Sequence, residues 1–222
     1  RIELDVAGAT TVVPELAGEK TADLVVLNDG DLSYGKLRFD DRSIATLKDH
    51  LGTIEDSLTR ALAWSAVWDM TRDGELAASD YVPMVLNALA HETDVAVVAT
   101  QMLQLGTAVE LYAADKNRDS LRAVLADGVE KLLDSAAAGS DMQLQYVRSF
   151  ASAAKSEAQI SKVRNILDGK LAGVTVDANL RWTLLNSLVE RGAATVAEVE
   201  AELANDKSAD GEKAAAFGRA AG

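Results

Sequence analysis

Residues 43–74 read SIATLKDHLGTIEDSLTRALAWSAVWDMTRDG, and this stretch decides the fold class. Its apolar residues recur every three or four positions, which is the period of a helix buried on one side. Ser43 is the predicted N-cap, and Asp73-Gly74 ends the run. Trp64 and Trp68 stand four positions apart and so share one helical face. We interpret them as core residues rather than as a ligand-binding stack, because leucines accompany them at helical spacing.

The helical period continues downstream to the C-terminus. Together with the opening stretch it predicts roughly ten helices joined by short turns. Asp127-Gly128 and Asp168-Gly169 are helix-ending signals. Helices in series with short loops pack as antiparallel neighbours, and a long run of them is typical of a HEAT- or armadillo-like superhelix. Because no repeat recurs at a fixed period, we expect a mostly α fold in an irregular superhelical array.

The first forty residues follow a different pattern. Ile2, Leu4 and Val6 alternate with polar residues, and Leu24-Val25-Val26-Leu27 is a short buried-strand pattern. Tyr34, Leu37 and Phe39 indicate a third strand that ends at Asp40-Asp41. Three strands bury too little apolar surface to fold alone. We therefore expect residues 1–41 to be the last strands of an incomplete β-sandwich, residues 42–222 to be a helical domain, and the chain to be a fragment of a longer protein.

The composition argues against two classes of partner and indicates a cellular compartment. A net charge of −13 repels phosphate backbones, which argues against nucleic acid. No uncharged apolar run approaches the roughly 20 residues of a membrane span, so we expect no membrane partner. The chain has no cysteine, which excludes disulfides, thiolate metal sites and cysteine nucleophiles. That usage suits a reducing compartment and predicts a cytoplasmic protein.

One partial catalytic motif is present, at His91-Glu92-Thr93-Asp94. A zinc-protease helix needs His-Glu-x-x-His, since two imidazoles one turn apart hold the metal. Position 95 is Val, and the other histidine is the distant His50. Two histidines could still join carboxylates at a metal, but no spacing favours it. We expect a structural or surface role for His91 and Glu92.

The remaining charged candidates have structural interpretations of their own. An acidic pair among Asp29, Asp31, Asp40 and Asp41 can do acid–base work when burial separates the pKa values, although charged loops at strand ends are commoner. Arg181 follows a predicted helix start at Asp177. It could face a cavity and bind a carboxylate bidentately, or it could pair with Asp177 one turn back. The frequency of such helical pairs favours the second alternative.

Four stretches together resemble the C-terminal (ERAP1-C-like) domain of M1-family zinc aminopeptidases, particularly the bacterial aminopeptidase N type found in actinobacteria. Their order and spacing make the resemblance fairly specific, and they span nearly the whole chain. The family's Gly-Ala-Met-Glu-Asn and His-Glu-x-x-His motifs are absent from this sequence. The matching stretches are Asn28–Asp40, Ala61–Leu76, Asp177–Trp182 and Asn205–Gly211.

The resemblance implies a parent enzyme that removes N-terminal amino acids from peptides with one zinc ion. The zinc ligands and the catalytic residues would lie upstream, so no catalytic or metal residue is assigned to this chain, and it is predicted to be inactive alone. It would close over the active site and shape the peptide cavity, with the catalytic domain of the same polypeptide and peptide substrates as its partners. The candidates for cavity-lining or inter-domain residues are Arg181, Trp182, Tyr34 and Arg38.

A function of a different class is a stand-alone helical-repeat scaffold that binds other proteins. Such a scaffold would need no orphan strands, and it would carry polar caps at both ends. The incomplete β segment at residues 1–41 therefore favours the aminopeptidase domain.

Overall fold

Helices form all the regular structure of the computed structural model, which describes residues 2–222. The prediction of a mostly α fold is confirmed. Two short 3-10 helices, η1 and η2, and one π-helical turn, η3, accompany the α-helices. The elements are η1 Pro14–Leu16, α1 Asp41–His50, η2 Leu51–Thr53, α2 Ser57–Arg72, α3 Ala78–Leu89, α4 Val95–Thr107, η3 Ala108–Tyr112, α5 Asp115–Ser135, α6 Asp141–Ala153, α7 Glu157–Leu167, α8 Ala178–Glu190, α9 Val196–Asn205 and α10 Ala209–Ala221.

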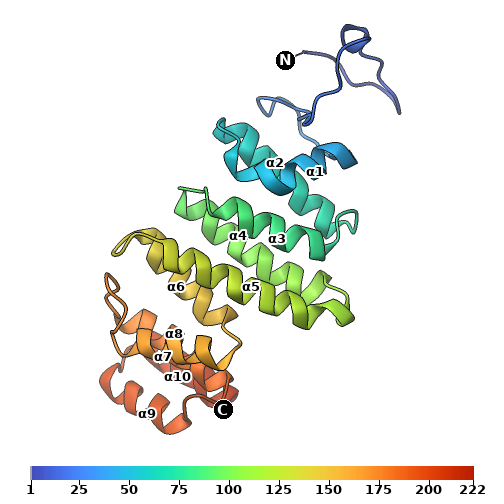
Figure 1. Cartoon of the computed structure of the whole chain (residues 1–222). Helices are drawn as coiled ribbons and strands as arrows, with labels where there is room; N and C mark the ends of the chain where they lie inside the picture. Colours follow the sequence, from blue (N-terminus) through green and yellow to red (C-terminus); the bar gives the residue numbers. More distant parts are fainter. Residues whose placement is uncertain (1) are drawn as a thin grey trace.

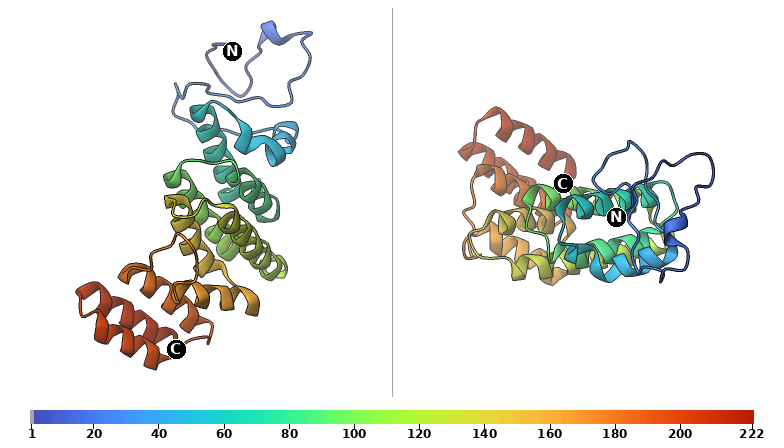
Figure 2. Two further views of the ribbon diagram at one scale, coloured as in Figure 1. Left: turned by 60° about the vertical axis from the view of Figure 1, so that its left-hand side comes forward. Right: turned by 90° about the horizontal axis from the view of Figure 1, so that it is seen from above.

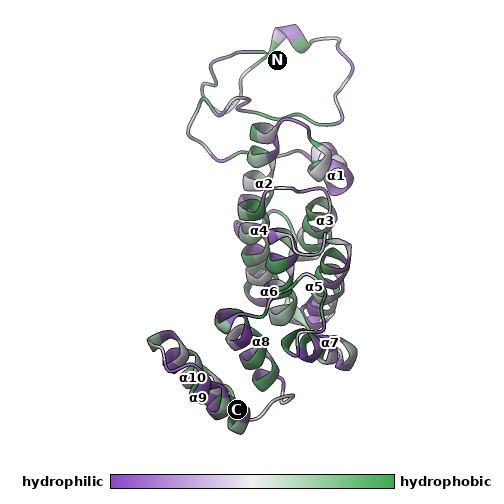
Figure 3. Cartoon of the chain, turned by 90° about the vertical axis from the view of Figure 1, so that its left-hand side faces the viewer, coloured by the Kyte–Doolittle hydropathy of each residue, from purple (hydrophilic) through white to green (hydrophobic). Residues whose placement is uncertain are grey.

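The helices lie in two rows, as Figure 1 and Figure 3 show. One row holds α1, α3, α5 and α7, and the other holds α2, α4, α6 and α8. Along the rows, α1 contacts α3, α3 contacts α5, α4 contacts α6, and α6 contacts α8. Contacts between α5 and α6 and between α7 and α8 join the two rows, and α9 and α10 pack on α8 at the C-terminal end. The array is elongated and curved in the two views of Figure 2.

Side-chain caps fix where most helices begin. Each capping oxygen accepts a backbone N–H of the first helical turn, which would otherwise lack a partner. The caps on α1, α2, α4, α6, α7, α8, α9 and α10 are Asp40, Asp56, Asp94, Ser140, Ser156, Asp177, Thr195 and Ser208.

The predicted cap at Ser43 is wrong, and the structure shows why. Asp40 begins α1 by accepting the Ser43 backbone N–H at 2.7 Å. The Ser43 hydroxyl is buried and accepts the Val25 backbone N–H at 3.1 Å. Asp40, one of the acidic candidates, is therefore a helix cap, and Ser43 holds the upstream segment against α1.

A continuous hydrophobic core runs between the two rows. Trp64 is buried within it, as predicted. Trp68 lies half-buried between Tyr81 and Tyr112, with ring centroids 5.7 Å and 5.8 Å from its own. Tilted aromatic pairs at this separation add favourable electrostatics to the area that they bury. The tryptophans therefore help to join α2, α3 and η3.

The strands expected in residues 1–41 do not form in this chain. Residues 2–40 adopt extended and turn conformations with the single helix η1, and no strand is assigned anywhere in residues 2–222. A strand needs a partner to pair its backbone N–H and C=O groups. These segments do not pair with one another, so the alternation of apolar residues has no ladder to join.

The two halves of this segment differ in their contacts. The Asp23 carboxylate binds Arg42, and its backbone oxygen accepts the Thr46 hydroxyl at 2.6 Å. Phe39 is buried against the core. Upstream, by contrast, Val6 is 80% exposed, and the chain loops away from the helices (Figure 1). Packing against the helical array thus begins near residue 23.

One segment, Val95–Tyr112, is long and apolar enough by length and composition to cross a membrane. It comprises α4 and η3. In this structure it packs against α3 and α6, and 28% of it is buried. A core helix passes the same test, so the segment is weak evidence for a span.

Candidate functional site

Arg181 lies in the second turn of α8 and binds a carboxylate with two nitrogens. Asp177 caps this helix by accepting the Leu180 backbone N–H at 2.8 Å, so it is not the partner of Arg181. The guanidinium instead reaches Glu202 on α9, with Nε 3.0 Å from Oε1 and Nη2 2.8 Å from Oε2. Arg181 therefore binds a carboxylate bidentately, as one of the two predicted alternatives had it, but this carboxylate belongs to the protein itself.

This pair lines a cleft between α7, α8 and α9 with a volume of about 610 Å³. A second arginine, Arg164 on α7, also lines it and donates from Nη1 to Glu198 Oε1 at 2.7 Å. Both arginines therefore bind carboxylates from α9. The remaining lining residues are Leu167, Asp168, Gly169, Val176, Leu185, Ala201 and Asn205.

The charges of this cleft are paired internally. Hydrogen bonding to Glu202 raises the pKa of Arg181. The Thr195 backbone N–H, followed by the Arg164 guanidinium, holds the pKa of Glu198 below its ordinary value. A ligand with a carboxylate would have to compete with Glu202 or Glu198 for its arginine. These ion pairs therefore hold α9 against α7 and α8.

The other three candidates do not meet Arg181 in this cleft. Trp182 follows Arg181 in the sequence but is buried, and its indole N–H donates to Asp206 Oδ2 at 2.8 Å. Tyr34 is wholly exposed. Arg38 pairs with Asp73 and Glu75 after α2. The segment holding Tyr34 and Arg38 and the helix α8 lie at opposite ends of the array (Figure 1).

The partial zinc motif has a structural role, in which Glu92 links the loop after α3 to α2. Glu92 has a side chain only 2% exposed, and its Oε2 lies 3.2 Å from Arg60 Nε on α2. Its Oε1 accepts the backbone N–H groups of Thr93 and Asp94 at 2.9 Å and 3.1 Å. His91 is exposed. Within residues 2–222, no three His, Cys, Asp or Glu side chains gather as metal ligands would.

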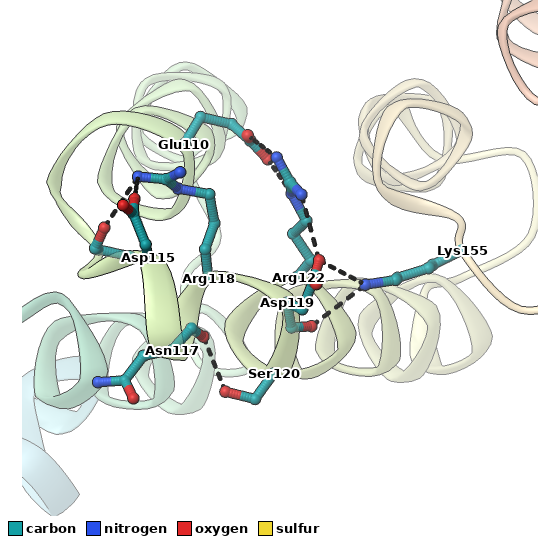
Figure 4. Close-up of polar contacts among 9 residues, drawn as sticks. Glu110, Asp115, Asn117, Arg118, Asp119, Ser120, Arg122 and Lys155 are labelled. Carbon is teal, nitrogen blue, oxygen red and sulfur yellow. Dashed lines mark hydrogen bonds and ion pairs between the residues drawn. The ribbon is translucent and has the colours of Figure 1, made fainter.

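A second polar cluster fastens η3 to α5 and to the loop after α6, and Figure 4 shows its members. Arg122 binds Glu110 and Asp119, and Asp119 also accepts from Lys155 Nζ at 3.2 Å. The Arg122 guanidinium holds the pKa of Glu110 below its ordinary value. These side chains are largely exposed, so water screens the pairs and each contributes little to stability. The cluster offers no group activated for catalysis.

Sequence reasoning did not find the partners of these arginines. Glu202 stands 21 residues from Arg181, Glu198 stands 34 from Arg164, and Glu92 stands 32 from Arg60. Local charge spacing reports only on neighbours one helical turn away. No signal in one sequence identifies such pairs, because each depends on how separate helices pack.

Acid is expected to destabilise the fold, in part because protonation of Glu198 removes its contacts with Thr195 and Arg164. Its pKa is lower in the folded chain than the ordinary 4.5 of the unfolded chain, so its contribution is present above about pH 4.5 and is lost as the pH falls through the folded value. We expect Glu198→Gln to lower the thermal midpoint at pH 7 and the difference from the parent to shrink toward pH 3. Thermal unfolding followed by circular dichroism measures both. A difference that stays constant with pH would contradict this assignment.

Two comparisons with known proteins place the chain in a family. The family model described as the ERAP1-like C-terminal domain matches residues 24–221. The chain is 42% identical over 223 aligned residues to Aminopeptidase N of Streptomyces lividans. The alignment covers all of this chain and 26% of that protein, so the chain spans about a quarter of the length of this relative. The family match extends over most of the sequence, and the chain therefore belongs to the family of ERAP1-like C-terminal domains.

Proposed function

We propose that this chain is the non-catalytic, helical C-terminal domain of a zinc aminopeptidase that removes N-terminal amino acids from peptides. The observation that carries the proposal is the 42% identity to an aminopeptidase N along the whole chain, with the alignment confined to 26% of that protein. Identity at this level along the full length supports a shared position in a longer polypeptide. It gives no support to the alternative of a stand-alone scaffold.

The residues of this chain do not fit the zinc ion that such an enzyme uses. The nearest motif lacks a second histidine, and the carboxylate of Glu92 is engaged by Arg60 and by two backbone N–H groups. In the proposed enzyme, the ligands and the catalytic residues lie upstream of this chain. We therefore assign no chemical step to residues 2–222.

The proposed division places residues 1–41 at the end of a β-sandwich and residues 42–222 in the helical domain. Several apolar side chains in the first part are exposed, including Val6, Val12 and Leu27. Upstream strands would pair with this segment and cover these exposed side chains, because no strand ladder forms within residues 2–40. Tyr34 and Arg38 would then lie at the junction between the two domains.

The helical domain is proposed to close over the upstream active site and to shape the cavity that holds the peptide. Its two rows of helices support an irregular superhelix of the HEAT or armadillo type, which offers an extended concave surface. Closure would exclude water and large folded substrates. Arg181 and Trp182 would shape the C-terminal end of this surface by fixing α9 and the loop before α10. A cytoplasmic location remains part of the proposal, resting on the absence of cysteine.

An aminopeptidase assay tests this function directly. The chain alone with added zinc and the product of the longer gene are each incubated with an amino-acid arylamide. We expect chelator-sensitive hydrolysis from the longer product and none above background from the chain alone. Metal-dependent turnover by the chain alone would refute the non-catalytic role, and a start codon immediately before the codon for Arg1 would count against the fragment assignment.

A further inference from the structure

A largely exposed face without charged residues runs along α4 to the start of η3, where the exposed Glu110 borders it. We call it the α4 face, and it consists of Ala96, Thr100, Leu103, Thr107 and Leu111. Leu103 is 75% exposed and Leu111 is 71% exposed. The sequence has no charged residue from position 95 to position 109, whereas α5 in the other row carries nine in its 21 residues. An apolar face within such an acidic chain requires an explanation.

The backbone is distorted where this face ends. The Ala113 N–H donates to Ala108 O at 2.8 Å, across five residues rather than four, which makes η3 a π-helical turn. Such turns are rare and occur frequently at functional sites. The wider turn sets Tyr112 against Trp68, with ring centroids 5.8 Å apart, while Leu111 projects into solvent. Leu111 is thus exposed at the same turn in which Tyr112 packs on Trp68.

The neighbouring helix of the same row, α2, also has an uncharged stretch. In α2, positions 61–68 carry no charged side chain, and Ala61 and Ser65 are exposed. The one arginine before them, Arg60, turns inward to Glu92. Figure 3 shows α2 and α4 in the same row, and α2 contacts η3. Both helices of this row therefore carry an uncharged stretch with exposed residues.

We propose that the α4 face is the docking surface for the upstream part of the same polypeptide. This inference rests on the proposed function. The relative matched by this chain extends well beyond it, since 74% of that protein lies outside the alignment (100% less the 26% covered). A covalently linked partner has a high effective concentration, so it can cover a small apolar face without charged contacts. Covering the two leucines removes apolar area from water, which favours contact.

The charge of the chain argues against a second copy as the occupant. Each copy carries a net charge of −13, so bringing two α4 faces together would oppose two strongly acidic molecules. The face itself contributes no cation that could offset this repulsion. The upstream part of the polypeptide is therefore the occupant that we test.

Because the chain contains no cysteine, a single introduced thiol can report on this face. Leu103→Cys is prepared in the chain alone and in the longer gene product, and labelling by a maleimide is followed by peptide mass spectrometry. We expect labelling at position 103 to be at least 10-fold slower in the longer protein. The matched control is Val124→Cys on α5 in the other row, where the parent residue is 41% exposed, and its rate should be similar in both proteins.

The outcomes separate this proposal from the proposed function. Equal labelling rates at position 103 in a longer protein that hydrolyses arylamides would overturn the docking surface and leave the enzyme assignment intact. Slow labelling in a longer protein without activity would support docking and count against the enzyme. Labelling of the chain alone that slows as its concentration rises would assign the face to self-association and overturn the proposal.

Discussion

Replacing Arg60 with alanine is expected to lower the free energy of unfolding by about 3 kcal/mol or more, because it leaves a buried carboxylate without its cation. Glu92 keeps its two backbone N–H donors but loses the guanidinium. Arg60 Nη1 also donates to Ile54 O at 2.6 Å, so a backbone acceptor before α2 loses its partner as well. Urea unfolding of the parent and the variant, followed by tryptophan fluorescence, measures the difference.

A second substitution identifies the cause of that loss. In the Arg60→Ala background, Glu92→Gln is expected to restore part of the stability, since a neutral amide oxygen still accepts from the backbone and needs no cation. The exposed pair of Arg42 with Asp23 supplies the control, and Arg42→Ala should leave the unfolding midpoint nearly unchanged. If Glu92→Gln made the Arg60→Ala variant still less stable, the unpaired charge would not be the reason.

The second large effect is expected from Phe150→Ala, at about 3–5 kcal/mol. Phe150 is fully buried in α6, and this helix contacts α4, α5, α7 and α8. The Lys162 ammonium lies 5.4 Å from the ring centroid and would lose a cation–π contact. The lost area and the remaining cavity both lower stability, and thermal or urea unfolding detects the change.

Two further variants serve as comparisons for the loss of stability in Phe150→Ala. Phe150→Leu keeps most of the volume and should cost much less than Phe150→Ala. Phe217 on α10 is 56% exposed, so Phe217→Ala serves as the matched control for losing a phenyl group at the surface. Equal effects of Phe217→Ala and Phe150→Ala would show that α6 is not the central packing element of the array.

Most of the candidate site could not be predicted from the sequence. The sequence favoured a pair of Arg181 with Asp177 over bidentate binding of another carboxylate, and this preference was wrong. Glu202 as its partner, and the second pair of Arg164 with Glu198, became visible only when α9 was placed against α7 and α8. The failure at residues 1–41 has a related cause. Alternating side chains predict a strand only where a partner strand exists, and no such partner lies within residues 2–222.

Two glycines show what the sequence determines and what tertiary structure decides. Gly169 follows α7 with a φ of 75°, a conformation that glycine adopts at little cost, so the helix ends there as predicted. Gly128 also follows an aspartate, yet it lies inside α5, so this helix-ending prediction is wrong. A Cβ at this position would come within 2.6 Å of Leu86 Cδ1 on α3, so glycine here lets the two helices lie close together. The sequence alone determined the helical character and most helix starts, since apolar period and caps act within one or two turns. Only tertiary structure decided which glycine allows close packing, which carboxylate meets which arginine and which helix face stays uncovered, because these depend on contacts between segments far apart in the chain.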